Sequence, residues 1–229
     1  MGVKPANDTN FGYVFVRSNA FNQFEPVSGK FGKDPSDVSL RIHNEAETND
    51  TAQTNKENPY IDISGYMPDL VQPGDTINIH ANLAFNDETN QSRYIEVAYF
   101  NDKGSSSFDF GGGSHAFDIS SAGSVSCLGT HMGTVPYVKN KWYDVNLVYT
   151  VGTPAEGETA AVQNKIEVYV DGVKLGEKFF SVNAAKPIIT GIRQVRVGYT
   201  NTNSEKKVFS ACDLYVDDFS VAVYTGRCV

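Results

Sequence analysis

The sequence has little positive charge. Nineteen lysines and arginines stand against 27 aspartates and glutamates in 229 residues, and the formal net charge is −8. Basic residues cluster nowhere beyond the pair Lys206-Lys207. Nucleic-acid-binding proteins carry a basic patch, and helices that bind membrane surfaces are basic and amphipathic. Neither a nucleic acid nor a membrane is therefore expected as a partner.

Long apolar runs and a regular set of cysteines are absent as well. No window approaches the roughly 18 apolar residues of a transmembrane helix, and the first ten residues lack the apolar core of a signal peptide. The three cysteines, Cys127, Cys212 and Cys228, have no metal-ligand spacing. One disulfide (Cys212–Cys228 or Cys127–Cys212) and three free thiols are the alternatives that this number leaves open.

Strict alternation of apolar and polar residues is the main pattern that is present. In Thr76–Phe85 every second residue from Ile77 onward is apolar, while Asn78, His80 and Asn82 take the opposite face. Such alternation is typical of a β-strand with one buried face. The pattern recurs in Arg93–Phe100, Trp142–Thr150, Lys165–Leu175, Gln194–Thr200 and Leu214–Tyr224.

Turn signals separate these runs. Asp171-Gly172 predicts a two-residue hairpin turn of type I′, and Gly111–Gly113 marks another loop. About eleven to thirteen short strands at this spacing predict an all-β fold, an antiparallel β-sandwich of the jelly-roll type. Because no internal repeat or long linker interrupts the pattern, we expect residues 1–229 to form one domain.

Four runs resemble the concanavalin A-like jelly-roll superfamily: PGDTINIHANLAF, KWYDVNLVYT, NKIEVYVDG and LYVDDFSVAVY. More narrowly, they are similar to the non-catalytic carbohydrate-binding modules of bacterial polysaccharide-degrading enzymes. The resemblance implies a module that binds a plant cell-wall-type polysaccharide. It further implies a secreted or cell-surface protein linked to a catalytic or anchoring domain. One such fold hosts many functions, so the resemblance specifies the fold better than the activity.

The polysaccharide is expected to lie across an exposed sheet face. Amide and imidazole groups can both donate to and accept from sugar hydroxyls, and aromatic rings offer a stacking surface. The expected ligand-binding residues are Asn78, His80, Asn82, Tyr94, Glu96, Trp142, Asn146 and Tyr169. An ordinary solvated face is the alternative for the polar residues, and a structural place at the edge of the core is the alternative for Trp142.

Two adjacent acids, Asp217 and Asp218, lie within the last predicted strand. Neighbouring strand residues point to opposite faces, so one carboxylate is directed inward and requires a cation or several donors. The resemblance implies calcium, held by Asn22 and Glu25 near the start of the chain together with the two aspartates. A β-bulge, with both acids solvated or accepting backbone N–H bonds, is the alternative.

Motifs for catalysis are incomplete. The Glu-x-Asp-x-x-Glu pattern of glucanases with this fold is absent. Jelly-roll lyases that resemble alginate lyases use three motif-bearing strands, of which only isolated residues are found. His80, Arg93 and Tyr94 are candidates for base, carboxylate neutraliser and acid. We therefore predict a binding module without enzyme activity, and the alternatives are a polysaccharide lyase and a bacterial surface adhesin.

Overall fold

The computed structural model describes residues 22–44, 47–48, 60–62, 74–86, 92–100, 106–107, 117–120, 122–127, 129–152, 163–181, 192–200, 208–209 and 212–225. Within these ranges the chain is nearly all strand, and a short 3₁₀ turn, η1 (Lys30–Gly32), is the one helical element. No helix in the described ranges has the length and apolarity needed to cross a membrane.

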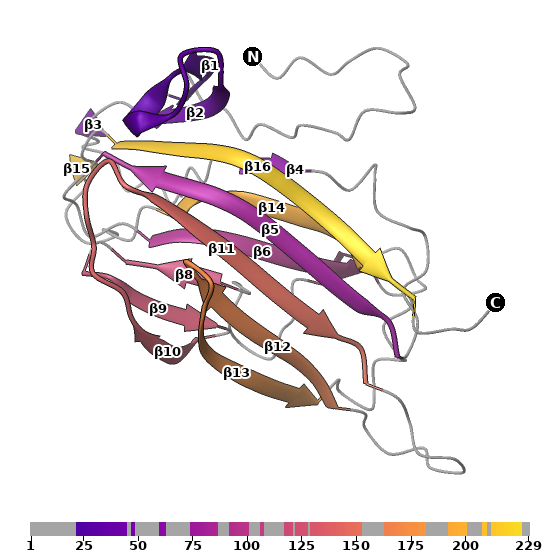
Figure 1. Cartoon of the computed structure of the whole chain (residues 1–229). Coiled ribbons are helices and arrows are strands. Elements are labelled where there is room, and N and C mark those ends of the chain that lie inside the picture. Colours follow the sequence, from indigo (N-terminus) through magenta and orange to yellow (C-terminus); the bar gives the residue numbers. More distant parts are fainter. Residues whose placement is uncertain are drawn as a thin grey trace, which may run out of the picture.

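Seven antiparallel strands form the first sheet, called sheet A (Figure 1). Strand β5 lies at its centre, between the last strand of the chain and β11. In spatial order the strands are β1 (Asn22–Ser28), β2 (Val38–Asn44), β16 (Cys212–Tyr224), β5 (Thr76–Phe85), β11 (Trp142–Thr150), β12 (Gln163–Val170) and β13 (Val173–Ser181).

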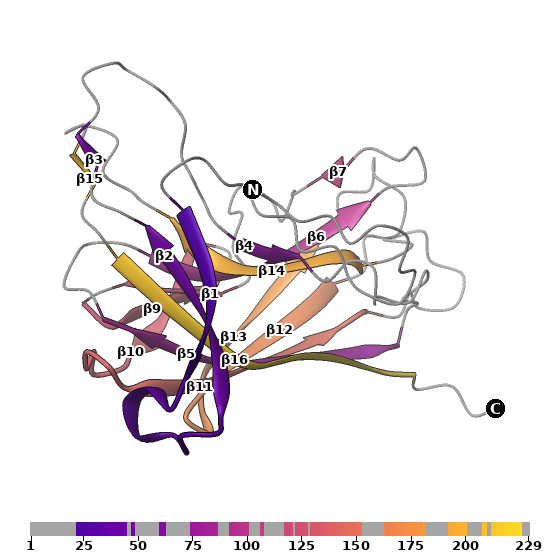
Figure 2. The same cartoon turned by 90° about the horizontal axis from the view of Figure 1, so that it is seen from above.

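The second sheet, sheet B, lies behind sheet A in Figure 1, and Figure 2 shows the two layers from above. Its spatial order is β10 (Thr130–Thr134), β9 (Ser124–Cys127), β8 (Phe117–Ile119), β6 (Ser92–Phe100), β14 (Ile192–Thr200) and β4 (Tyr60–Asp62), and β7 (Ser106–Ser107) pairs with β6. A separate small pair consists of β3 (Glu47–Thr48) and β15 (Val208–Phe209). The predicted antiparallel sandwich is confirmed.

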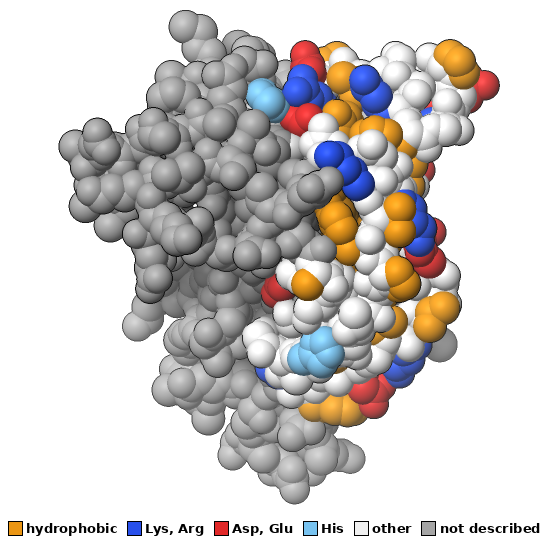
Figure 3. Space-filling model, turned by 90° about the vertical axis from the view of Figure 1, so that its left-hand side faces the viewer, with side chains coloured by type: hydrophobic (Ala, Val, Ile, Leu, Met, Phe, Trp, Pro, Cys, Tyr) orange, Lys and Arg blue, Asp and Glu red, His pale blue; other side chains and the backbone are white. Residues whose placement is uncertain are grey.

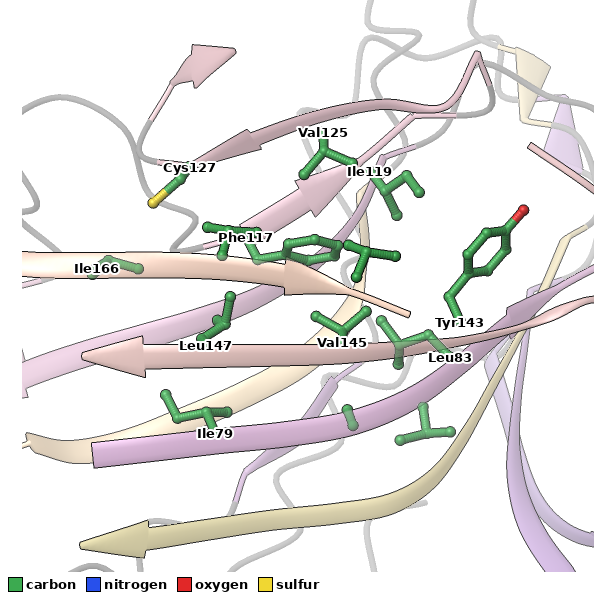
Figure 4. Packing of buried hydrophobic residues seen from close by; sticks show 14 of the residues in the cluster. Ile79, Leu83, Phe117, Ile119, Val125, Cys127, Tyr143, Val145, Leu147 and Ile166 are labelled. Atoms are coloured by element: carbon green, nitrogen blue, oxygen red, sulfur yellow. The ribbon is translucent and has the colours of Figure 1, made fainter. Parts of the chain in front are cut away.

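The alternation in the sequence becomes the core between the sheets. The apolar residues of β5 from Ile77 to Phe85 are at most 1% exposed at every second position. They pack with Val145 and Leu147 of β11 against Phe117 and Ile119 of sheet B (Figure 4). Each fully buried side chain of this kind stabilises the fold by about 1.5–3 kcal/mol. Burial of this face therefore fixes which residues of each strand point outward.

The predicted hairpin at Asp171-Gly172 is confirmed. Strand β12 ends at Val170, and β13 begins at Val173. Both turn residues have positive φ, 50° for Asp171 and 74° for Gly172, as a type I′ turn requires. The turn brings β13 to the edge of sheet A.

Cys127 is a free, fully buried cysteine in the core. Burial raises the pKa of its thiol to about 12, so the thiol stays protonated at neutral pH. Because Cys127 is free, the Cys127–Cys212 disulfide is not formed. Cys228 lies outside the described residues.

One side of the sandwich is closed where β10 of sheet B meets β13 of sheet A. Lys178 donates a hydrogen bond from Nζ to the Thr130 hydroxyl at 2.7 Å. A side chain at Gly176 would meet the sulfur of Met132 at 2.8 Å, so the glycine allows this close approach. The contact positions β9 and β10 at the edge of sheet B.

Two glycines near β9 allow the packing of this edge to be tested. Gly123 and Gly129 have similar positive φ values, 76° and 72°. A Cβ at Gly123 would lie 1.9 Å from the carbonyl oxygen of Val135, whereas nothing lies within 4 Å of one at Gly129. We expect Gly129→Ala to cost about 1–2 kcal/mol, the cost of a left-handed non-glycine residue. Gly123→Ala should cost about 2 kcal/mol more through overpacking. Urea unfolding measures both, and equal losses would contradict this packing.

Candidate functional site

The predicted ligand-binding residues fall on two different sheets. Asn78, His80 and Asn82 lie on β5 of sheet A, while Tyr94 and Glu96 lie on β6 of sheet B. The outward positions of β5 and β6 therefore face opposite sides of the sandwich and do not form one surface. The same separation keeps His80 away from Arg93 and Tyr94, so these three residues do not converge as base, neutraliser and acid.

On the outer face of sheet A, His80 is held by groups of the chain itself. Its Nδ1 lies 3.1 Å from the Asp218 carbonyl oxygen, and its Nε2 lies 3.3 Å from Asp144 Oδ1. Asn82 donates to Asp218 Oδ2 at 2.7 Å. Asn146 pairs in register with both His80 and Tyr169. This face is polar, and acids surround its histidine.

Trp142 makes contacts within the chain at the end of the same face. Its indole N–H donates to the Lys30 carbonyl at 3.1 Å, and Lys33 Nζ lies 4.7 Å from the ring centroid. Phe31 of the η1 turn lies against both the indole and the Tyr215 ring. The turn thus covers the tryptophan, which supports the structural alternative for it.

The paired acids of the last strand lie at a β-bulge. Asp217 pairs with Asn82 and Ser220 with His80, so two residues of β16 stand opposite one residue of β5. Asp218 has φ 49°, and its carboxylate is exposed, whereas that of Asp217 is 11% exposed. The ammonium of Lys33 donates to Asp217. Lys33 therefore balances the sheltered charge, and both aspartates lie on the outer side of the sheet.

Glu25, the other carboxylate expected to bind calcium, belongs to a different cluster. It forms an ion pair with Arg41, and Arg41 Nε donates to Asp213 Oδ1 at 3.0 Å. Asp213 also accepts hydrogen bonds from Asn86 at 2.6 Å and from His43. Burial alone would raise the pKa of Asp213, but the hydrogen bonds from these partners outweigh it and lower the pKa.

The described residues do not test the expected calcium clip as a whole. No group of three or more acids, histidines or cysteines in the described part of the chain is arranged to hold a metal ion. The side chain of Asn22 lies outside the described part. Calcium binding thus stays a prediction, and the structure gives Asp217 and Glu25 cationic partners of their own.

A row of residues joined by register pairing crosses the outer face of sheet B, and it includes side chains of the kinds that bind ligands or transfer protons. Register pairing joins His131 of β10 to Ser126 of β9, Ser126 to Asp118 of β8, Asp118 to Tyr94 of β6, and Tyr94 to Gly198 of β14. Direct register partners share a face of a sheet. For β4, β6 and β14 the structure describes the backbone register and not the side chains. The row places a histidine, an acid and a tyrosine on one surface.

A second row lies two residues along the strands. Arg196 of β14 pairs with Glu96 of β6 and with Asp62 of β4. Because the side-chain period of a strand is two, these positions lie on the same face as Tyr94 and Gly198. By register, the positions of Arg196 and of three acids (Asp62, Glu96 and Asp118) therefore lie on this face of the sheet.

Asp118 is the described acid at the centre of this surface. Its neighbours Phe117 and Ile119 are buried in the core, so Asp118 points outward. Ser126 donates a hydrogen bond to Asp118 Oδ1 at 3.0 Å. Burial raises the pKa of Asp118, and the weaker effect of the Ser126 hydrogen bond lowers it. A carboxyl group with a raised pKa is a frequent feature of functional sites.

The sequence-based prediction missed Asp118, Ser126, His131 and Arg196. The alternation Phe117-Asp118-Ile119 carried the signal for Asp118, but β8 has three residues and β9 four. Such short runs give weak patterns.

Charges of both signs are interspersed with polar and hydrophobic side chains on the side of the molecule seen in Figure 3.

No protein-family model and no curated protein sequence matches the chain. Similar solved structures are alginate lyases. The alginate lyase vAL-1 from Chlorella virus shares 9% sequence identity, covers 90% of this chain and 92% of its own, and has a TM-score of 0.58. A family 7 alginate lyase, A1-II′, in complex with substrate shares 11% identity over 93% of this chain and 85% of its own, with a TM-score of 0.50.

These comparisons support the concanavalin A-like jelly-roll fold. They contradict the prediction of a non-catalytic carbohydrate-binding module without enzyme activity, because solved structures that share the fold over most of their length include polysaccharide lyases. The incomplete motifs misled the sequence-based prediction. At about 10% identity a catalytic surface can be rebuilt while the strands keep their places.

The Asp213 cluster predicts a specific dependence of stability on pH. Its lowered pKa means that ionised Asp213 stabilises the folded state above the unfolded-state pKa of about 3.9. This stabilisation is lost as the pH falls through the lower folded-state pKa. We expect Asp213→Asn to cost about 1–3 kcal/mol at neutral pH and to reduce the loss of stability between pH 7 and pH 3. Urea unfolding at both pH values measures this, with the exposed Asp37→Asn as control. Equal pH dependence in the two variants would contradict it.

A second test separates the Lys33 ion pair from calcium. If Lys33 is the partner of Asp217, Lys33→Met lowers the melting temperature, and a chelator leaves that of the wild-type protein unchanged. Removing one partner of a sheltered pair leaves the other charge uncompensated, so we expect a loss of about 1–3 kcal/mol. A melting temperature that falls in chelator and recovers with added calcium would instead support the calcium clip.

Proposed function

We propose that the chain is a polysaccharide lyase that cleaves an acidic polysaccharide on the outer face of sheet B. The observation that carries the proposal is the register row from His131 to Gly198, with Asp118 and Tyr94 at its centre. The fold, similar to that of alginate lyases over about nine-tenths of both chains, supports it. The substrate would be a polymer that contains uronic acids.

The chemistry of β-elimination requires three groups. A cation or several donors must neutralise the uronate carboxylate, a base must remove the proton next to that carboxylate, and an acid must protonate the departing glycosidic oxygen. Arg196 supplies the cation. Tyr94, the direct register partner of Asp118 and diagonal to Arg196, supplies a phenol group. In its ionised form this group would take the proton next to the uronate carboxylate, and the neutral phenol so formed would give that proton to the departing glycosidic oxygen. In the proposed site these two residues act on one sugar.

His131 lies too far from Tyr94 to act on the same bond of the substrate. It lies three strands from Tyr94, and neighbouring strands are about 4.8 Å apart, so the two positions are about 14 Å apart. Groups that act on one bond lie within hydrogen-bond reach of it. We therefore place His131, which bonds to the Ser124 hydroxyl at 3.0 Å, beside a neighbouring sugar of the bound chain.

On the polar face of sheet A, charged groups satisfy one another. Asp144 and Asp218 flank His80 there, and Lys165 and Lys174 both pair with Glu167. We place the site on sheet B because Arg196 and Tyr94 occupy diagonal register positions there. We also propose that the protein acts outside the cell, because a polysaccharide is too large to enter it.

Incubation with alginate, pectate and other uronate polymers tests the proposal. Lyase action creates an unsaturated sugar, so ultraviolet absorbance should rise. Tyr94→Phe should lower kcat by roughly 10²–10⁴-fold, the usual contribution of general acid–base catalysis, without a change in melting temperature. Tyr169→Phe, on the outer face of sheet A, is the matched control and should retain full activity. If no uronate polymer yields unsaturated product, the proposed function is wrong.

A further inference from the structure

We propose that Asp118 is a specificity-determining residue that admits an anionic sugar beside Tyr94 when it is protonated and repels that sugar when it is ionised. The proposal rests on the proposed function of the outer face of sheet B and adds a control by pH. Its consequence is a preference for acidic conditions on free uronates, which disappears for sugars whose carboxyl groups are esterified.

The first argument is the absence of a cationic partner. Three sheltered acids elsewhere are paired with cations: Asp213 with Arg41, Asp217 with Lys33, and Glu167 with two lysines. Among the described residues, the one hydrogen-bond partner of Asp118 is the uncharged hydroxyl of Ser126. This hydroxyl carries no charge, so within the described part of the chain it leaves the negative charge of ionised Asp118 uncompensated.

The second argument is the charge balance around Asp118. On β6 the positions of Tyr94, its direct register partner, and Glu96, a diagonal one, lie beside it. On β9 the hydroxyl of Ser126 bonds to it, and Ser124 occupies a diagonal register position. His131 lies beyond β9 on the same face. Cys127 points into the core, and Lys178 of β13 bonds to Thr130 at the edge.

Asp62 and Glu96 are both paired in register with Arg196. Among these register positions, ionised Asp118 is a third negative charge beside a single positive one. A uronate carboxylate adds a fourth. Like charges disfavour each other's ionised form, so ionised Asp118 opposes binding of the substrate.

The direction of the pH effect follows from burial. Burial raises the pKa of Asp118, and the Ser126 hydrogen bond offsets part of that rise. As the pH rises through this raised pKa, Asp118 becomes charged and the substrate is repelled. We expect KM for a uronate polymer to rise roughly fivefold across this range, as for two unit charges a few ångströms apart in water. The value of kcat should change less.

Two variants test the assignment in opposite ways. Asp118→Asn keeps the shape and removes the charge, so KM should stay low at every pH. Ser126→Ala removes the donor that favours ionised Asp118, so the rise in KM should move to higher pH. If the role of Asp118 were purely structural, neither Asp118→Asn nor Ser126→Ala would change the pH dependence of KM in these ways. If Asp118→Asn does not fold, the pH dependence of KM in Ser126→Ala still tests the proposal, because an unshifted profile would contradict it.

Two controls address other titrating groups. Histidines change charge in a neighbouring pH range, so His131→Gln must retain the Asp118-dependent rise in KM. Asp144→Asn, on the outer face of sheet A, should leave the profile unchanged. The proposal is overturned if Asp118→Asn keeps the wild-type profile, or if it abolishes turnover at all pH values, as loss of an obligatory base would.

Binding separates this proposal from the proposed function. Affinity electrophoresis in gels that contain polygalacturonate reports retention without turnover. Wild-type protein should be retained more strongly at low than at neutral pH, Asp118→Asn equally at both, and an esterified pectin gel should abolish the difference. If retention follows this pattern but no unsaturated product forms, the proposed lyase activity is wrong and the role of Asp118 in binding is supported. Equal retention of wild type and Asp118→Asn at both pH values would overturn that role.

Discussion

The burial of one face of β5 is the constraint on which the rest of the structure depends. This strand lies between β16 and β11 and places an apolar residue in the core at every second position. A shift of one residue would expose the whole apolar set and bury Asn78, His80 and Asn82. The register of β5 therefore fixes the outward side chains of sheet A, and the residues it meets, Phe117 and Ile119, fix Asp118 on the opposite surface.

The two outer faces differ in how their charges are satisfied. On sheet A the chain pairs its own charges, since Lys33 reaches Asp217 and two lysines reach Glu167. Such pairing satisfies the charged groups before any ligand arrives. On sheet B, the hydroxyl of Ser126 is the hydrogen-bond partner of Asp118 among the described residues. Burial raises the pKa of Asp118, and a carboxyl group with a raised pKa is a frequent feature of functional sites.

The sheltered ion pairs also explain how the strands of a β-sandwich accommodate partly buried acidic residues. Asp213 and Asp217 occupy outward positions of β16 that other elements partly cover. A covered carboxylate is costly unless it is paired, and Arg41 and Lys33 supply the charge. The bulge at Asp218 lets β16 continue in register with β5 after this crowded point. The terminal strands β1 and β2 are thereby joined to the sheet by electrostatics as well as by backbone hydrogen bonds.

The sequence by itself determined the elements and their buried faces. Period-two alternation located β5, β11 and β16 and separated Ile77 from Asn78, because side-chain direction in a strand is a local property. Asp171-Gly172 located a turn for the same reason. Only the tertiary structure decided that β5 and β6 lie in different sheets, which separates His80 from Tyr94. It also decided that Lys33 meets Asp217 across 184 residues of sequence, because strand order and long-range pairing depend on how whole faces pack together.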